Sequence, residues 1–181
     1  MERTTVRLDF TYPKGYLIVR LFLTLLLILL LAMIMLMFSI SGVWSYITIA
    51  ILIIYFIIVG VSPLFTDHWV TLTRLVLRQG WYFKVSIPYT EIESIGRTDE
   101  LGKYGLRSAL FKGKVYIVTS QQGLVSIKLR NPIRFLMILG KEANELIVSV
   151  EQSEAFVSAV RERMKLLPPI HTNGTDAQLG Y

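Results

Sequence analysis

The sequence LFLTLLLILLLAMIMLMF, at Leu21–Phe38, carries no charged side chain. A second apolar run, VWSYITIAILIIYFIIVGV, follows at Val43–Val61. Extended back to Tyr16 and on to Ile40, the first run is long enough to cross a hydrocarbon core of about 30 Å, and the second is close to the roughly 20 residues that a crossing needs. Because backbone groups in hydrocarbon must bond internally, both runs are predicted to be transmembrane helices.

The link between the two runs sets their relative direction. Only Ser39-Ile40-Ser41-Gly42 separates them, so the helices are predicted to form an antiparallel hairpin with both chain ends on one side. The link carries no cation, whereas both flanks do, so both termini are expected to be cytoplasmic. The flanking cations are Arg3, Arg7, Lys14, Arg20, Arg74 and Arg78.

Aromatic residues and the distribution of charge agree with this hairpin. Tyr12 and Tyr16 suit the inner membrane interface, and Trp44 and Tyr46 suit the outer one. The centres of both runs lack acidic and basic residues, which ion or proton pathways usually need. A cleaved signal peptide is the alternative, but an apolar run this long behind a leader of 20 residues fits an uncleaved anchor better.

The composition also favours a membrane protein. The 181 residues are 53% hydrophobic and only 18% charged, which is little charge for the surface of a soluble domain. The net charge of +6 indicates attraction to anionic lipid headgroups, and no nucleic-acid partner is expected. The chain has no cysteine, which excludes disulfides and thiolate metal sites.

After Ser62-Pro63 the pattern changes to the alternation typical of strands. Gln79-Gly80 is predicted to be a turn, and Ser120–Gly123 is predicted to close a hairpin. A loop punctuated by glycines is expected between the fourth and fifth strands. The seven predicted strands cover His68–Thr73, Leu75–Arg78, Tyr82–Ile87, Ile92–Thr98, Lys114–Thr119, Leu124–Leu129 and Glu145–Val150.

Two helices are predicted in the same region. Asn131-Pro132 resembles a helix start, with Gly140 as its stop. A second helix of about 15 residues begins near Gln152, with an apolar stripe that recurs at helical spacing, and Pro168-Pro169 ends it. The stripe comprises Phe156, Ala159, Val160, Met164 and Leu167.

The N-terminal arm also alternates. Val6, Leu8, Phe10 and Tyr12 are separated by polar residues, a period of two. This pattern favours an extra strand at the edge of the sheet over an extended leader that touches lipid.

Several of these stretches together resemble a known family. They are Trp69–Arg78, Ile87-Pro88-Tyr89-x-x-Ile92-x-Ser94-Ile95, the final strand and the helix that bears Phe156. They resemble bacterial pleckstrin-homology-like (bPH) domain membrane proteins, many of which begin with two transmembrane helices. The resemblance runs from about Tyr16 to Met164 and implies a membrane α+β fold: a transmembrane hairpin, then a PH-like antiparallel β-barrel capped by a C-terminal helix. It implies no ligand, because such barrels host many functions.

The expected organisation therefore has four parts. Residues 1–15 form a cytoplasmic arm, 16–63 the transmembrane hairpin, 64–166 the PH-like domain and 167–181 a mobile tail.

Motifs for catalysis are lacking. The two histidines, His68 and His171, lie far apart and do not have metal-ligand spacing. The sequence has neither a phosphate-binding glycine loop nor a nucleophile elbow. The acidic residues Glu91, Glu93, Asp99 and Glu100 are expected to be a solvated face. We therefore expect no enzyme activity, metal or cofactor.

One charge pattern suggests a binding site. Lys103, Arg107, Lys112 and Lys114 place four cations in twelve residues without an acid among them. Since the domain begins close to the membrane, this loop is a candidate for binding anionic lipid headgroups; the alternative is a solvated loop with ordinary positive-inside bias. Lys128, Arg130 and Arg134 could add to the region.

The function expected from the sequence is a membrane-anchored, non-enzymatic adaptor or scaffold. Its domain would bind a protein partner, itself or anionic lipid headgroups at the inner leaflet. The alternative is an auxiliary or assembly subunit of a larger membrane complex, with the hairpin as its contact surface.

Overall fold

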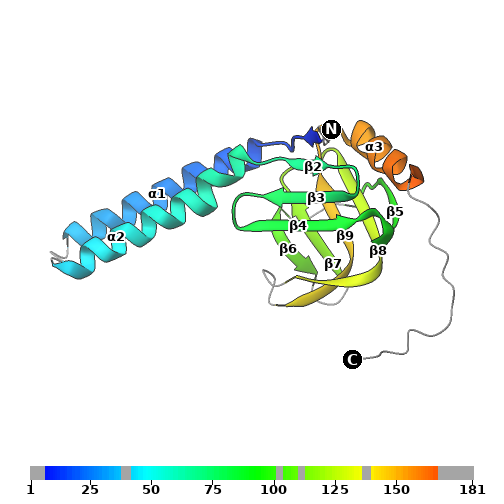
Figure 1. The fold of residues 1–181 in the computed structure, drawn as a ribbon. Coiled ribbons are helices and arrows are strands. Elements are labelled where there is room, and N and C mark those ends of the chain that lie inside the picture. The colour runs from blue at the N-terminus through cyan, green and yellow to red at the C-terminus, as the bar shows by residue number, and fades with distance from the viewer. Residues whose placement is uncertain (1–6, 38–41, 101–103, 110–112, 136–139, 167–181) are drawn as a thin grey trace, which may run out of the picture.

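The computed structural model describes residues 7–37, 42–100, 104–109, 113–135 and 140–166. A pair of long helices leads into a unit of two β-sheets and a C-terminal helix (Figure 1). The predictions made for Arg3, Val6, the link at 39–41 and the tail at 167–181 lie outside the described residues.

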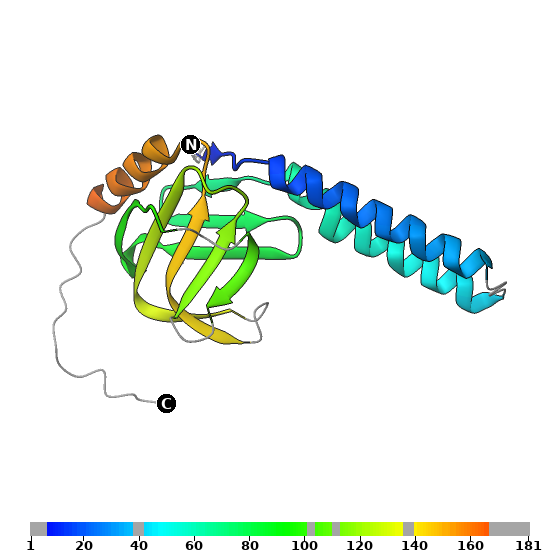
Figure 2. The ribbon, with the colours of Figure 1, turned by 180° about the vertical axis from the view of Figure 1, so that it is seen from behind.

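The helix pair confirms the two predicted helices. The first is α1 (Gly15–Met37); the second is α2 (Val43–Tyr55), which continues through a π-helical turn, η1 (Phe56–Val61), and a 3-10 turn, η2 (Ser62–Phe65). They run side by side in opposite directions (Figures 1 and 2). Stretches of both, Gly15–Met35 and Val43–Phe65, are long and apolar enough to cross a membrane.

Most apolar side chains of this pair are exposed. Trp44, for example, is 77% exposed, and α2, which the structure describes completely, has no buried residue. A helix in the core of a soluble domain would instead bury one apolar face. The pair is thus an apolar surface that the other described residues leave largely uncovered.

The first sheet has the strand order β1-β2-β3-β4 and is antiparallel throughout. The predicted extra strand of the N-terminal arm is confirmed, because Leu8 pairs with Val70 across β1 and β2. The predicted strand at 68–73 is shorter and ends at Val70. The bounds are β1 (Leu8–Phe10), β2 (His68–Val70), β3 (Arg74–Gln79) and β4 (Phe83–Pro88).

The second sheet has the order β5-β8-β9-β7-β6, and only β7 and β9 pair in parallel (Figure 2). A 3-10 turn, η3 (Tyr89–Glu91), leads into it from β4. The bounds are β5 (Ile92–Arg97), β6 (Gly105–Ala109), β7 (Lys114–Val118), β8 (Leu124–Phe135) and β9 (Lys141–Ser149).

The predicted hairpin at Ser120–Gly123 is wrong. Strand β9 lies between β7 and β8, so the chain at 119–123 crosses over the end of β9 instead of closing a pair. Val150 N–H donates to the Gly123 carbonyl oxygen at 3.0 Å, which fixes the crossing. Local turn chemistry could not reveal a strand inserted from a later part of the chain.

The helix predicted from Asn131-Pro132 is also wrong, because β8 continues to Phe135. The pairing of β8 with β9 breaks register between Lys128 and Ile133. Pro132 lies in this irregular stretch, where a missing N–H costs no ladder hydrogen bond. The Asn131 side chain donates to Glu91 at 3.0 Å.

Strand β6 lies where a loop was predicted. It pairs antiparallel with β7 at the edge of the second sheet. Its sequence, GLRSA, has few residues that favour strands. Pairing with β7 therefore stabilises the extended conformation that the local sequence does not favour.

The larger of two apolar clusters among the described residues lies between the two sheets and beneath α3 (Ser153–Leu166); the smaller comprises Tyr116, Val118, Leu124 and Ile147 of the second sheet. The predicted C-terminal helix is confirmed, with Phe156 and Val160 fully buried. Phe10 of β1 packs edge-on against Phe156 with ring centroids 5.2 Å apart. Among the described residues the strands form two sheets and not a closed barrel, so the PH-like barrel is not confirmed.

Candidate functional site at the helix–domain junction

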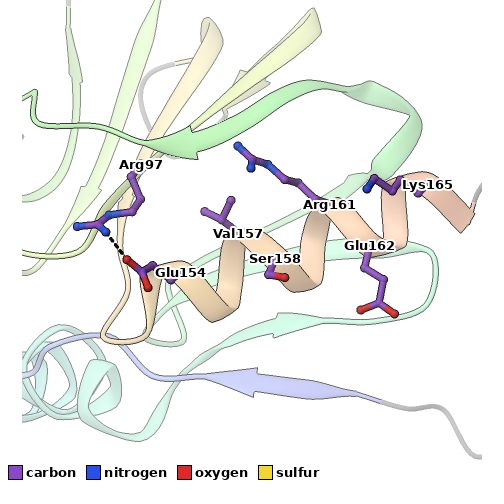
Figure 3. A pocket seen from close by; sticks show the side chains of 7 residues that line it. All are labelled: Arg97, Glu154, Val157, Ser158, Arg161, Glu162 and Lys165. Carbon is purple, nitrogen blue, oxygen red and sulfur yellow. Dashed lines mark hydrogen bonds and ion pairs between the residues drawn. The ribbon is translucent and has the colours of Figure 1, made fainter.

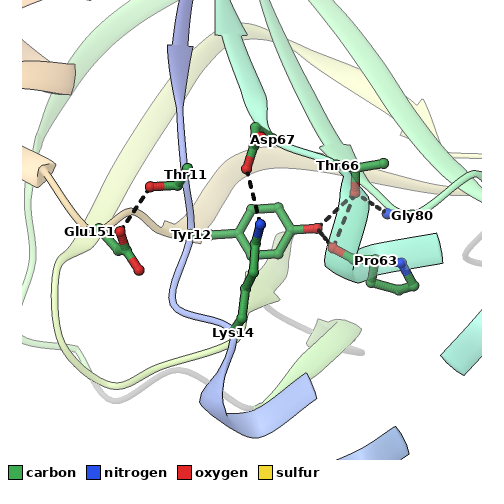
Figure 4. A network of polar contacts seen from close by, with 8 residues as sticks. All are labelled: Thr11, Tyr12, Lys14, Pro63, Thr66, Asp67, Gly80 and Glu151. Carbon is green, nitrogen blue, oxygen red and sulfur yellow. Dashed lines mark hydrogen bonds and ion pairs between the residues drawn. The ribbon is translucent and has the colours of Figure 1, made fainter. Parts of the chain in front are cut away.

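The helix pair joins the two-sheet domain through two short connections, residues 11–14 and 66–67. A network of polar contacts links both connections to the domain (Figure 4). Ser62, Thr66 and His68, three of the buried polar residues that the structure describes, lie at this junction.

Tyr12 lies at the centre of the junction and is only 1% exposed. Its hydroxyl donates to the Pro63 carbonyl oxygen at 2.5 Å and lies 2.8 Å from Thr66 Oγ1, which accepts the Gly80 N–H at 2.8 Å. Burial raises the pKa of the Tyr12 phenol to about 12, so it remains a donor at neutral pH. Tyr12 was predicted to be an interfacial aromatic residue; it is instead a buried connector.

A second contact joins η2 to the β3–β4 turn. Ser62 Oγ accepts the Trp81 N–H at 2.9 Å and donates to the Ile58 carbonyl oxygen at 2.5 Å. Gly80 has φ +67°, and a Cβ there would lie 2.7 Å from Ser62 Oγ. The turn therefore approaches the helix end closely only because residue 80 is glycine.

Two further contacts hold the N-terminal connection. Thr11 donates from Oγ1 to Glu151 at 2.8 Å, and Glu151 N–H donates back to the Thr11 carbonyl oxygen at 3.1 Å. Lys14 lies 3.7 Å from Asp67, so an ion pair joins the two connections directly. The arm is thereby tied both to the segment before α3 and to the segment before β2.

His68 completes the buried layer. Its Nδ1 accepts the Arg78 N–H at 3.2 Å, and its ring lies 5.1 Å from that of Tyr12. Burial lowers the pKa of His68 to about 4, so the ring is neutral at physiological pH. Within the described residues, His68 Nε2 and the Gln79 amide are buried without hydrogen-bond partners, which costs stability.

Most of this junction has no local signature in the sequence. Ser62 and Thr66 give no local signal, because their partners are distant in sequence. Tyr12 did give one: it continues the alternation of Leu8 and Phe10, whose phase points into the core.

The outer face of the first sheet carries an aromatic residue among cations. The Arg7 guanidinium lies 3.7 Å from the Trp69 ring centroid, Arg78 lies 5.5 Å away and the Lys84 ammonium 5.8 Å. Asp9 pairs with Arg7 at 2.6 Å. These distances are within the range of cation–π attraction, and the remaining cations leave this face basic.

The predicted basic loop is distributed differently. Arg107 is exposed on β6, whereas Lys103 and Lys112 lie outside the described residues. Lys114 begins β7 and lies 2.5 Å from Glu100 and 3.1 Å from Glu145. Glu100 and Glu145 lie 14 and 31 residues from Lys114 in the sequence, so the run of cations alone did not indicate that Lys114 is ion-paired.

The ion pairs of Lys114 have a structural origin. Strands β5 and β6 lie at opposite edges of the second sheet. Glu100, three residues after the end of β5, accepts hydrogen bonds from Lys114 and from the Tyr116 hydroxyl at 3.1 Å, both on β7. The hydrogen bond to Glu100 is the main cause that raises the pKa of Lys114. Of the additional cations, Lys128 and Arg130 are exposed on β8.

An open groove of about 660 Å³ lies along α3 (Figure 3). Arg97 pairs with Glu154 at 2.5 Å, and Arg161 donates to the Ile95 carbonyl oxygen at 2.8 Å. The groove lies at the end of the domain away from the helix pair (Figures 1 and 3). Its seven lining residues are Arg97, Glu154, Val157, Ser158, Arg161, Glu162 and Lys165.

A search of the described residues for three or more metal-ligating side chains in one place finds no such group. Comparison with protein-family models, with curated proteins and with solved structures finds no match to this chain.

Proposed function

We propose that this protein is a membrane-anchored, non-enzymatic adaptor, whose two-sheet domain binds a protein partner, itself or anionic headgroups at the inner leaflet. The observation that carries the proposal is the exposed apolar helix pair that is joined, through buried hydrogen bonds of Tyr12, Ser62 and Thr66, to a folded domain. A tether joined in this way holds the domain in one orientation.

Free energy supports insertion of the helix pair into a bilayer. Each fully exposed Leu, Ile or Phe side chain forgoes roughly 1.5–3 kcal/mol of burial. More than a dozen Leu, Ile and Phe side chains of α1 and α2 are 38–65% exposed, so leaving the pair in water costs on the order of tens of kcal/mol even when each counts for about half. Soluble monomers rarely expose apolar patches of this size.

The pairing of β1 with β2 supports a common side for both flanks. These strands precede and follow the helix pair, and Leu8 pairs with Val70. If the chain crosses the membrane twice, the segments before and after the helix pair are on the same side and can pair in this way. The cations on the flanks favour the cytoplasmic side, so the proposal places both termini there.

The adaptor role rests on the groove along α3. It lies along α3, which is on the side of the domain away from the helix pair in Figure 1, where a protein partner could approach. The order of strands followed by one packed helix also supports a pleckstrin-homology-like domain as the fold in this proposal.

The second candidate is an auxiliary or assembly subunit of a membrane complex. The observation that favours it is the fully unburied α2, whose apolar side chains could pack against helices of another protein. In that case the helix pair, and not the groove, holds the partner.

The membrane topology can be tested directly because the chain has no cysteine. Single substitutions Trp44→Cys, near the link, and Ser158→Cys, on α3, are both at exposed positions. A membrane-impermeant maleimide applied to intact cells should label the first variant only, and should label the second after lysis. Equal labelling of both in intact cells contradicts the proposed topology.

The partner site can then be tested by crosslinking in cells. Ser158→Arg with Glu162→Lys alters the groove, and Glu93→Arg with Ser94→Lys is a control at exposed positions on β5. Loss of the crosslinked partner with the groove variant alone supports the adaptor. Loss only when the helix pair is replaced by an unrelated hairpin supports the subunit.

A further inference from the structure

Two large aromatic side chains are exposed where the helices meet the domain. Phe65, the last residue of η2, is 77% exposed, and Trp81, in the β3–β4 turn, is 61% exposed. Phe65 also ends the second stretch that is long enough to span a membrane. The neighbouring Tyr12 and Pro63 are buried, so Phe65 and Trp81 are the exposed aromatic side chains beside a buried layer.

The position of the Trp81 backbone is fixed relative to the helix end. The backbone N–H of Trp81 donates to Ser62 Oγ, and the backbone N–H of the preceding Gly80 donates to Thr66 Oγ1. The β3–β4 turn points back toward the helix pair (Figure 1). Trp81 therefore lies at the level of residues 62–66, where a spanning helix would leave the hydrocarbon. Tryptophan is enriched at this interfacial level.

Two cations lie behind the β3–β4 turn, on the side away from the helix pair. Arg78 and Lys84 are paired across β3 and β4, and the pair Gln79 and Phe83 separates them from the turn. At about 3.4 Å per residue, they lie about 7 Å from the turn. The polar headgroup layer on each side of a bilayer is roughly 5–8 Å thick, so both cations reach it when Trp81 is at the interface.

The local charge favours an anionic ligand. Lys84 is exposed, and Arg78 is held beside the turn by a 3.3 Å hydrogen bond to the Gly80 carbonyl oxygen. On this face the acid closest to the Trp69 cluster, Asp9, is paired with Arg7. A phosphate or carboxylate on a headgroup would thus meet two cations without a competing carboxylate from their own strands.

We propose that the β3–β4 turn is a lipid-binding site: Phe65 and Trp81 insert into the interfacial layer, and Arg78 and Lys84 bind anionic phospholipid headgroups. This inference rests on the proposed membrane anchoring and goes beyond it, because it assigns the surface of the domain that contacts the bilayer. It also differs from the basic loop suggested by the sequence, in which Lys114 is engaged by carboxylates.

The three tryptophans provide the test. Full-length variants that keep only Trp44, Trp69 or Trp81, with phenylalanine at the other two positions, are reconstituted into vesicles that contain brominated phospholipid. Trp81 should be quenched at least about twofold more than Trp69, which the strand register places about 13 Å farther from the turn. Trp44 reports insertion of the helices independently.

The outcomes separate the two proposals. An unquenched Trp44 overturns membrane insertion itself. A quenched Trp44 with Trp81 quenched no more than Trp69 overturns the lipid-binding site while the anchoring stands.

The cations are tested with brominated phosphatidylserine and brominated phosphatidylcholine at equal mole fraction. Enrichment of anionic lipid around the site should make quenching of Trp81 by phosphatidylserine about twofold stronger. Arg78→Gln with Lys84→Gln should remove this preference, whereas Lys128→Gln with Arg130→Gln, an equal loss of charge on β8, should keep it. An identical preference in both double variants overturns the headgroup role of Arg78 and Lys84.

Discussion

Removing the Tyr12 hydroxyl tests how the domain is joined to the helices. Tyr12→Phe keeps the ring in its buried site but deletes the donor to the Pro63 carbonyl oxygen and the contact with Thr66 Oγ1. Thr66 can reach the Pro63 oxygen only at 3.4 Å, a weak replacement. A buried acceptor that loses its partner costs about 1–3 kcal/mol, so we expect a loss of about 2 kcal/mol.

The assay is thermal unfolding of the full chain in detergent, followed by tryptophan fluorescence. A loss of about 2 kcal/mol corresponds to a fall in Tm of roughly 4–8 °C for a chain of this length. Hydrogen exchange gives the local readout: the Gly80 amide, which donates to Thr66, should exchange up to about 30-fold faster, since its hydrogen bond loses its support.

Tyr46→Phe is the matched control, because it deletes the same hydroxyl from an exposed residue of α2. It should leave both Tm and Gly80 exchange unchanged. If Tyr12→Phe behaves like Tyr46→Phe, the hydrogen bonds of Tyr12 do not hold the junction together and the reasoning is refuted.

Three other perturbations have defined outcomes. The pKa of His68 is about 4 in the folded chain and near 6.5 when unfolded, so the unfolded chain binds more protons between these pH values and stability should fall by roughly 3 kcal/mol as the pH drops through that window. His68→Asn, which retains an acceptor, should flatten this part of the profile in denaturation midpoints measured from pH 7 to 4; an unchanged slope contradicts the assignment. Gly123→Ala places a Cβ 2.2 Å from a backbone oxygen at φ +65° and should cost roughly 2–4 kcal/mol in thermal unfolding, whereas Gly15→Ala, with open space around it, should cost far less; equal losses would argue against the crossing over β9. Glu100→Gln should lower the pKa of Lys114 in an NMR titration, because its carboxylate is the main cause that raises that pKa; no change would mean that Glu145 alone holds the lysine.

Features with a local signature could be predicted from the sequence. The helix pair follows from uninterrupted apolar runs, and α3 follows from the apolar stripe through Phe156 and Val160. Of the turn predicted at Gln79-Gly80, Gly80 lies in the turn, where its positive φ suits glycine, whereas Gln79 still belongs to β3. Strand β1, with three residues, was found because its alternation persists next to charged residues.

Features that depend on distant pairing could not. Nothing near Ser120–Gly123 indicates that β9 will enter between the flanking strands, and nothing near Pro132 shows that the register breaks there. Both failures have one cause: a turn or cap signal reports a local preference, whereas strand order depends on the whole sheet.

For the cations around Trp69, the sequence shows the charges but not how they come together. The cations on β3 and β4 are visible in the sequence, but their shared face with Trp69 and their distance from the helix end depend on strand register. For Lys114, Glu145 becomes a partner through the parallel pairing of β7 with β9, and Glu100 through the segment that follows β5.

The pairing of β1 with β2 also has a consequence for biosynthesis. Residues 8–10 leave the ribosome before either candidate span, and their partners at 68–70 leave after both. In the proposed inserted state, a chain with only one span threaded would have β1 and β2 on opposite sides of the bilayer. The edge of β2 would then be unpaired and Phe156 would lack its aromatic partner Phe10. In that proposed state, the first sheet could close only after both spans had been threaded, and a misthreaded chain would leave an edge of the sheet unpaired.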